Sequence, residues 1–329
     1  MATDAQDAGM PADGLGWAVE ACAQLRVALT EVLYGQASLV EGLTLAVLAG
    51  GHVLLEGPPG VGKTLAARAL ARLLGGSFAR VQCVPDLLPA DITGSSVWLK
   101  DQAAFSIRRG PIFAHVVLAD ELNRATPRTQ SALLEAMAEG QVTIDGERLV
   151  LPQPHLVIAT QNPADTEGTY PLPLSERDRF LVALRVGYPD PERERALLAA
   201  PGAVGLERLA GLDPVGEGPT GWVRARQAVR TGVQVRAEVA DYVHRLILAT
   251  RSHPDLEFGV SPRGGLLLLA VARARAALAG RDFVTPDDVQ AAWLPVARHR
   301  IRSQPEVELE GFDADELLTR IAAETEVPR

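Results

Sequence analysis

A glycine-rich stretch carries the clearest chemistry in the sequence. Residues 57–64 read GPPGVGKT and match the pattern G-x-x-x-x-G-K-[ST]. Glycines in such a loop let successive backbone N–H groups turn inward around a phosphate, and a helix that begins at Lys63 adds its positive dipole end. The Lys63 ammonium would reach the β- and γ-phosphates, and the Thr64 hydroxyl would be a ligand for Mg²⁺. The apolar run HVLLE at 52–56 precedes the loop and a helical pattern follows it, as the motif requires.

This context favours a phosphate loop over a strand–helix turn with incidental glycines. We therefore predict that the loop binds ATP together with Mg²⁺. The residues expected to contact the nucleotide here are Gly57, Pro58, Pro59, Gly60, Val61, Gly62, Lys63, Thr64 and Leu65.

Two carboxylates directly follow another apolar run. Residues 116–119 read VVLA and are followed by Asp120 and Glu121, about sixty residues after the loop. At such a strand end, Asp120 can hold the magnesium shell and Glu121 can orient and polarise the attacking water. Two acids after a strand often mark only the start of a solvated loop. Their occurrence together with the phosphate loop favours the catalytic interpretation.

A third polar group stands at the tip of another apolar run. Residues 156–160 read LVIAT and are followed by Gln161 and Asn162. An amide at this place can hydrogen-bond the γ-phosphate or the attacking water. Alone, Asn162 before a proline would be a turn residue, so the prediction depends on the two neighbouring motifs.

The elements that must position these groups follow an α/β pattern. Five short apolar runs predict strands covered on both faces, at 52–56, 78–82, 116–119, 156–160 and 180–186. Helical periodicity is expected at 17–32, 38–48 and 63–74, and proline- and glycine-rich segments follow Tyr188. We predict a flexible tail at 1–16, an α/β nucleotide-binding domain at 17–188, an all-helical domain at 189–302 and an acidic C-terminal segment at 303–329 that forms one more short helix.

Composition limits the function classes. The chain has 329 residues, of which 47% are hydrophobic, and its net charge is −9. This charge disfavours nucleic acid as the main partner, since phosphate-backbone binding needs a basic surface. Its two cysteines, Cys22 and Cys83, fit no metal or redox spacing, and no signal peptide or membrane span is visible. A cytoplasmic protein is expected.

Longer stretches resemble one family. The chain resembles the MoxR family of AAA+ ATPases from about residue 35 to 301 in its phosphate loop, its ADE and ATQNP motifs, and four more specific segments. These segments are PDLLPADITG (85–94), RGPIFAHVVLADE (109–121), TQSALLEAM (129–137) and EGTYPLP (167–173). The resemblance implies a P-loop NTPase core, with a five-stranded parallel sheet between helices, followed by a small helical lid.

The same resemblance implies a hexameric ring and a protein partner. Family members frequently act with a von Willebrand factor A domain protein and remodel, mature or insert metals or cofactors into partner complexes. Residues 86–108 correspond to the helix 2 insert, and 140–151 to a hairpin, both on the pore or partner-facing side. The Asp145-Gly146 pair within the second segment is itself a strong turn signal.

Further site residues are carried over from the family. Arg179, in the triplet Asp178-Arg179-Phe180, resembles the arginine finger that reaches the γ-phosphate of a neighbouring subunit, with Arg177 and Arg124 as alternatives. Arg177 follows Ser175-Glu176, where the family usually carries an apolar or amide residue before this triplet. That departure changes the charge at the expected subunit interface.

Two more assignments concern the lid and the adenine side. Arg263, in Ser261-Pro262-Arg263-Gly264, resembles the sensor 2 arginine of the lid, whose position would depend on the γ-phosphate. Gly35 and Gln36 resemble the adenine-side segment.

Three functions are compatible with these residues. The first is an ATP-driven remodelling chaperone, and the second is a nucleotide-gated binding platform with slow turnover. Glu121 argues against a platform that does not hydrolyse ATP. The third is a DNA motor, which the negative charge and the absence of basic segments interleaved with aromatic residues disfavour.

Overall fold

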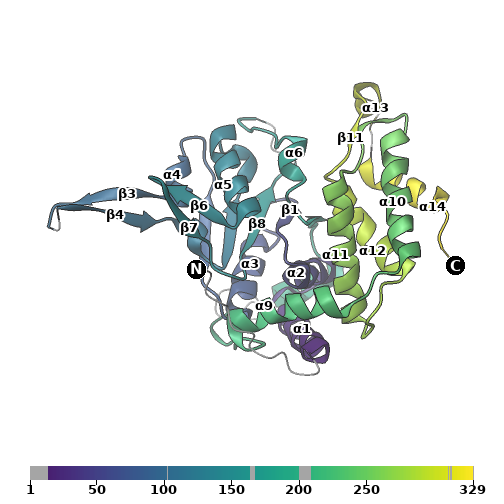
Figure 1. The fold of residues 1–329 in the computed structure, drawn as a ribbon, viewed down its shortest axis with the longest axis horizontal. Helices are drawn as coiled ribbons and strands as arrows, with labels where there is room; N and C mark the ends of the chain where they lie inside the picture. The colour runs from purple at the N-terminus through teal and green to yellow at the C-terminus, as the bar shows by residue number, and fades with distance from the viewer. Residues whose placement is uncertain are drawn as a thin grey trace, which may run out of the picture.

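The computed structural model describes residues 14–101, 103–163, 167–199, 209–309, 311 and 313–328. A parallel five-stranded sheet in the order β2-β5-β8-β1-β9 forms the centre of the larger part, as the sequence predicted (Figure 1). Its strands are β1 (Val53–Glu56), β2 (Phe78–Gln82), β5 (Val116–Asp120), β8 (Leu156–Gln161) and β9 (Val182–Arg185). The last strand is shorter than the predicted 180–186, because Phe180 and Leu181 still belong to the turn that leads into it.

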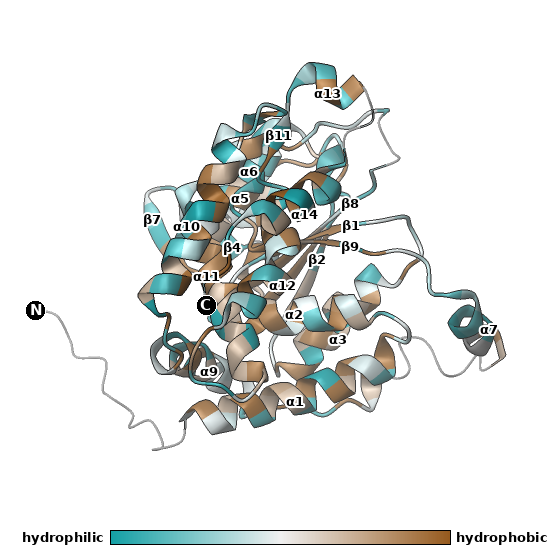
Figure 2. Cartoon of the chain, turned by 90° about the vertical axis from the view of Figure 1, so that its right-hand side faces the viewer, coloured by the Kyte–Doolittle hydropathy of each residue, from teal (hydrophilic) through white to brown (hydrophobic). Residues whose placement is uncertain are grey.

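Alternate residues of the central strands pack on opposite faces of the sheet. Val53, Leu55 and Ile158 join the core on the side of helices α1 to α3, whereas Leu54 and Val157 join the core on the side of α5. Each of these side chains is fully buried. The apolar character of the strands is visible in Figure 2, where the outer helices alternate between apolar and polar residues. A sheet buried on both faces explains why its strands read as apolar runs rather than alternating ones.

Helices on both sides hold this sheet. They are α1 (Gly14–Val32), α2 (Ala37–Ala49), α3 (Lys63–Leu73) and α5 (Pro127–Glu139). The predicted tail at 1–16 is too long, because α1 already begins at Gly14 and Leu15 packs against the core. Residues 1–13 of that tail lie outside the described residues.

The helical part stands beside the sheet (Figure 1). It contains α9 (Gly218–Gly232), α10 (Ala237–Ser252), α11 (Pro262–Leu278), α12 (Pro286–Ala297), α13 (Pro305–Leu309) and α14 (Ala314–Glu324), with the short pair β10 (Leu256–Phe258) and β11 (Arg302–Ser303). Helix α9 packs against α1 and α2, so a helix of the second half of the chain lies against the first helices. The acidic C-terminal segment forms two helices rather than the one expected, and α14 docks on α12, where the Trp293 indole N–H donates to the Leu318 carbonyl at 3.0 Å.

Two hairpins project from the sheet on the side away from the helical part (Figure 1). The predicted hairpin forms from β6 (Gln141–Ile144) and β7 (Glu147–Val150). The segment at 86–108 holds the short helix α4 (Pro89–Thr93) and the longer hairpin of β3 (Gly94–Leu99) and β4 (Ala104–Arg109).

Backbone lies against backbone at the base of the longer hairpin. A Cβ at Gly94 would lie 2.2 Å from the Arg108 carbonyl oxygen, and one at Gly110 would lie 2.2 Å from that of Ile92. Only glycine fits at these two positions.

Shorter elements complete the chain. They are the 3₁₀ turns η1 (Pro111–Phe113) and η2 (Leu122–Arg124) and the helices α6 (Leu174–Arg177) and α7 (Pro191–Ala199). Among the described residues, no helix has the length and apolar character that a membrane crossing requires.

Candidate active site

The glycine-rich loop connects β1 to α3 and faces open space. Gly60 and Gly62 have φ angles of 83° and 89°, which non-glycine residues rarely adopt. A Cβ at either position would meet nothing within 4 Å, so their backbone borders a free volume. Gly57 is the opposite case, because a Cβ there would lie 2.0 Å from the Val186 carbonyl oxygen. The loop is therefore anchored at its start and open where a phosphate would lie.

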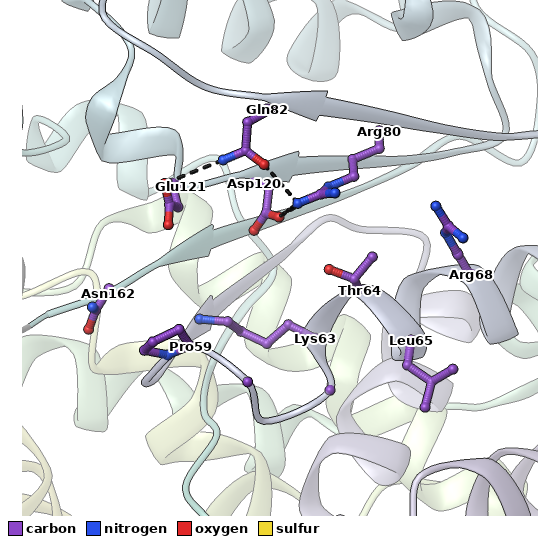
Figure 3. Close-up of a pocket in the computed structure, with 12 residues that line it drawn as sticks. Pro59, Lys63, Thr64, Leu65, Arg68, Arg80, Gln82, Asp120, Glu121 and Asn162 are labelled. Atoms are coloured by element: carbon purple, nitrogen blue, oxygen red, sulfur yellow. Dashed lines mark hydrogen bonds and ion pairs between the residues drawn. The ribbon is translucent and has the colours of Figure 1, made fainter. Parts of the chain in front are cut away.

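A cavity of about 630 Å³ begins at this loop (Figure 3). It is bounded by the loop, the first turns of α3 and the carboxyl ends of β2, β5 and β8. The residues that line it are Pro59, Gly60, Gly62, Lys63, Thr64, Leu65, Arg68, Arg80, Gln82, Asp120, Glu121 and Asn162. The structure thus brings the three sequence motifs to one place, as expected for the strand ends of a parallel sheet.

Asp120 ends β5 with both carboxylate oxygens engaged. Thr160 donates its hydroxyl to Asp120 Oδ1 at 2.7 Å, and Arg80 Nη2 lies 2.6 Å from Oδ2. The Thr160 hydroxyl also accepts the Glu121 backbone N–H at 2.8 Å. One threonine on β8 therefore fixes the side chain of the first acid and the backbone of the second.

Glu121 follows in a left-handed conformation, with φ at 57° and ψ at 49°. This backbone turns the chain sharply after the strand, and the side chain borders the cavity. Gln82 donates to Glu121 Oε2 at 3.3 Å, and Arg124 Nε lies 3.2 Å from the same oxygen. Glu121 is therefore held by one neutral and one charged neighbour at the edge of the cavity.

Lys63 is the cation at the centre of the site. Its ammonium donates to the Gly57 carbonyl at 2.7 Å, across the loop that it closes. Burial lowers the pKa of Lys63, whereas the charges of Asp120 and Glu121 act to raise it. The ammonium is suited to pair with the phosphate oxygens, and the carboxylates are suited to face the Mg²⁺ ion and its water shell.

Sequence reasoning missed three side chains of this cavity. Arg80 and Gln82 extend from β2 to the acids, and Arg68 extends from α3, where its guanidinium lies over the Phe78 ring at 5.5 Å. The signal was present in residues 78–82 (FARVQ), where polar residues alternate within a strand that otherwise reads as buried. This alternation points to the site only once β2 is known to lie beside β5, the strand that ends in Asp120.

A second cavity of about 350 Å³ lies on the other side of the loop. It is lined by Val32, Leu33, Tyr34, Gln36, Pro59, Gly60, Val61, Gly62, Leu65, Tyr188, Pro189, Glu194 and Leu198. Gln36 donates to the Gly187 carbonyl at 3.3 Å, which ties the first helices to the segment after β9. Apolar and aromatic side chains beside a phosphate loop are suited to a purine ring. Gly35 borders a neighbouring hollow instead, and Pro58 lines neither cavity.

The predicted arginines lie in different surroundings. Arg179 is half-buried, and its Nη1 donates to the Leu134 carbonyl of α5 at 2.8 Å. Burial lowers the pKa of Arg177, whose Nε has no hydrogen-bond partner within the described chain. Arg124 pairs with Glu121, and Arg263 is exposed in the first turn of α11. Among the residues that the structure describes, neither Arg179 nor Arg263 lines either cavity.

Comparison with known proteins identifies this arrangement. Residues 52–182 match the family model of ATPases associated with various cellular activities (AAA), and residues 248–321 match the AAA lid domain. The chain is 42% identical over 300 residues to the uncharacterised protein YeaC of Bacillus subtilis, covering 91% of this chain and 92% of that protein. It is 41% identical to the chaperone MoxR1 of Mycobacterium tuberculosis, covering 88% of this chain and 78% of that protein.

The chain belongs to the MoxR family of AAA+ ATPases. It is an ATP hydrolase, and it binds ATP. A solved structure of a candidate ATPase from Cytophaga hutchinsonii superposes with a TM-score of 0.88 at 31% identity, covering 96% of this chain and 98% of that one. The match to the AAA lid domain runs to residue 321, so the lid of this MoxR-family ATPase extends beyond the boundary at 302 that the sequence suggested.

The residues of the site fit the nucleotide and its metal. The free volume beside Gly60 and Gly62 leaves room for phosphates against the backbone. Thr64 and Asp120 both border the cavity and offer the oxygen ligands that Mg²⁺ prefers.

Proposed function

We propose that this MoxR-family ATPase assembles into a homo-oligomeric ring, hexameric by family resemblance, and hydrolyses ATP between subunits to remodel a partner protein. Its own chain supplies the phosphate loop, the acids and the polar tip of β8. A neighbouring subunit supplies an arginine. The cycle of binding and hydrolysis then changes the shape of a protein complex that contacts the ring.

Each of the predicted side chains has one chemical role. Lys63 neutralises the β- and γ-phosphates, and Thr64 and Asp120 would hold Mg²⁺. The metal supplies charge neutralisation between the phosphates. Glu121 accepts a proton from the attacking water, and Asn162 orients that water or the γ-phosphate. Arg263 reports on the γ-phosphate from the lid once the lid closes.

The position of Arg179 carries the proposal of a shared site. Arg179 lies outside the cavity that its own chain lines and is tied to α5 through Leu134. Arg124 is paired with Glu121 of its own site, and the charges of Glu56 and Glu308 act to raise the pKa of Arg177. Of the three candidates, Arg179 is therefore best placed to serve another subunit.

The projecting hairpin of β3 and β4 supports a protein partner. Trp98 and Phe105 form an edge-to-face pair with ring centroids 5.0 Å apart, yet they are 49% and 72% exposed. An exposed aromatic pair on a projection is suited to a protein contact. We propose that this side meets the client, and that a von Willebrand factor A domain protein is the adaptor. We propose maturation, or metal or cofactor insertion, as the outcome, and the name of the chaperone MoxR1 supports a chaperone role.

The experiment is ATP turnover per subunit over a range of protein concentrations, for the native chain, Glu121→Gln and Arg179→Ala. A shared site requires that turnover per subunit rises with concentration and that both variants bind ATP without hydrolysing it. Arg320→Ala, an exposed side chain of α14, is the matched control and keeps native turnover. A rate that is independent of concentration and survives the loss of Arg179 contradicts the shared site. A very low native turnover would favour the nucleotide-gated platform.

A further inference from the structure

Asp178 stands between the arginine segment and the lid. It caps α6 and immediately precedes Arg179, and its side chain is 19% exposed. Among the described residues, its side-chain hydrogen bonds go to the lid and not to the sheet. Arg300, which follows α12, and Ser261, which precedes α11, both bind its carboxylate. The Asp178 side chain is therefore one of the links that join the segment carrying Arg179 to the lid.

Arg300 is the buried half of this junction. Its side chain is 0% exposed, and its Nε donates to Asp178 Oδ1 at 2.9 Å. Its Nη2 donates to the carbonyls of Asp178, at 3.2 Å, and Phe180, and its Nη1 donates to the carbonyl of Leu181 at 3.3 Å. One lid guanidinium thus binds the main chain from residue 178 to 181 as well as the carboxylate. It holds the whole turn between α6 and β9.

Ser261 contributes the second lid contact. Its hydroxyl donates toward Asp178 Oδ2 at 2.9 Å and accepts the Gly264 N–H at 3.0 Å, which makes it the N-cap of α11. Arg263 lies in the first turn of that helix. A Cβ at Gly264 would lie 2.8 Å from Arg300 Cδ, so the start of α11 also packs directly on the buried guanidinium.

Arg300 keeps its charge at neutral pH. Burial lowers the pKa of Arg300 to about 10, and the carboxylate of Asp178 opposes that shift. Removing either partner of such a pair leaves a buried charge without compensation. The junction therefore resists separation when the lid moves.

We infer that Asp178 is a positioning residue that links the lid of one subunit to the arginine it presents to the next. Since Ser261 caps the helix that carries Arg263, a lid displacement set by the γ-phosphate is passed through Asp178 and Arg300 to the turn that holds Arg179. The nucleotide state of one site thereby sets the geometry of the arginine in its neighbour's site. The inference rests on the proposed trans role of Arg179.

Complementation between subunits tests this inference on the full-length chain. Asp178→Asn keeps the shape of the side chain and removes its charge. We expect its kcat to fall about tenfold or more with the ATP KM changed less than about twofold, since a misplaced group about 1 Å from its position can cost as much as 10²-fold. Mixed oligomers are then made with Glu121→Gln, which cannot hydrolyse ATP but presents a native Arg179. Turnover per Asp178→Asn subunit should rise several-fold toward the native value.

Arg179→Ala, mixed with Glu121→Gln in the same way, separates the two possible failures. If Arg179→Ala is not rescued, the shared site itself is wrong and the inference is overturned with it. If Arg179→Ala is rescued but Asp178→Asn is not, Asp178 acts within its own subunit and only the inference is overturned. Native kcat in Asp178→Asn alone also overturns it.

A second variant covers the case in which Asp178→Asn does not fold. Ser261→Gly removes the hydroxyl donor, keeps the Asp178–Arg300 pair and costs only a few tenths of a kcal/mol as an N-cap change. We expect the same rescue pattern with a kcat loss of about two- to fivefold. Thr285→Gly is the matched control, because Thr285 caps α12 through Asp288 without touching Asp178, and it should keep native kcat.

Discussion

The phosphate cavity and the junction around Asp178 are both built from opposite charges, but they use them differently. In the cavity, Lys63, Asp120 and Glu121 border open volume, and the charges of the acids act on the lysine from across it. In the junction, Arg300 is enclosed and each of its nitrogens has a protein partner. The cavity is prepared for a charged ligand, whereas the junction is complete without one. Substitutions in the cavity should therefore change activity, and substitutions in the junction should change stability as well.

The largest expected effect is on turnover in the cavity. Lys63→Ala removes the cation that faces the β- and γ-phosphates, and we expect ATP turnover to fall by about 10³-fold or more. Its melting temperature should stay near the native value, because the ammonium is only half-buried and its one recorded acceptor is a loop carbonyl. Turnover, binding of a fluorescent ATP analogue and thermal unfolding measure this. Lys100→Ala changes the other lysine of the chain, which is exposed, and should keep native turnover.

The second effect is on stability at the junction. Arg300→Met leaves Asp178 without its buried partner, and we expect a loss of about 3–5 kcal/mol in the free energy of unfolding. Arg302→Met is the control two residues away, since its pair with Glu257 is on the surface and contributes about 0–1 kcal/mol. Denaturant unfolding measures the loss of unfolding free energy in both variants. Equal losses would show that the junction is no more than another surface ion pair.

A smaller effect is expected where the cavity already contains a protein ion pair. Arg80 binds Asp120 Oδ2 at 2.6 Å, so a metal ion must compete with it for that oxygen. Arg80→Met should lower the Mg²⁺ concentration for half-maximal turnover by about three- to tenfold, equivalent to about 1 kcal/mol. Arg72→Met removes a guanidinium of α3 that donates to the Leu212 carbonyl at 2.9 Å. It leaves Asp120 untouched and should not change that concentration. An unchanged requirement in Arg80→Met would rule out the competition.

The smallest effect at neutral pH concerns three histidines, of which His299 contacts Arg300 in the junction. Burial lowers the pKa of His52 to about 3 and that of His155 to about 4, and burial lowers the pKa of His299 beside Arg300. These groups bind protons in the unfolded chain from about pH 6.5 downward but not in the folded one, so stability is full above that pH and falls as the pH drops toward 4. We expect a loss of about 1 kcal/mol per histidine for each pH unit below about 6.

Thermal unfolding between pH 7 and pH 4.5 measures this slope. His244→Gln should leave it unchanged, because His244 is exposed. His155→Asn should flatten it. A native melting temperature that does not vary over this range would contradict the buried-histidine argument.

The contrast between the cavity and the junction also explains how much of the structure could be predicted from the sequence. The cavity is made of contiguous motifs at strand ends, so Lys63, Thr64, Asp120, Glu121 and Asn162 could be placed together from the order of strands and loops. The sheet was equally readable, because strands buried on both faces leave apolar runs.

The junction could not be predicted in this way. Asp178, Ser261 and Arg300 are separated by about 80 and 40 residues, and no local pattern marks Arg300 as buried. Arg80 and Gln82 were missed for a related reason, since their importance depends on β2 pairing with β5. The start of α1 was misplaced because Gly14 and Gly16 read as a loop, while the packing of Leu15 on the core overrides that local preference.

The glycine pair at the base of the β3–β4 hairpin has a mechanical consequence. Gly94 and Gly110 pack backbone to backbone where the hairpin leaves the body, and this point is its pivot. Strands of this length extend about 20 Å at roughly 3.3 Å per residue, so a rotation of about 10° at the pivot moves the tip by about 3.5 Å. The hairpin is thus a lever, and the same rotation moves Trp98 and Phe105, roughly 13 Å from the pivot, by about 2.3 Å.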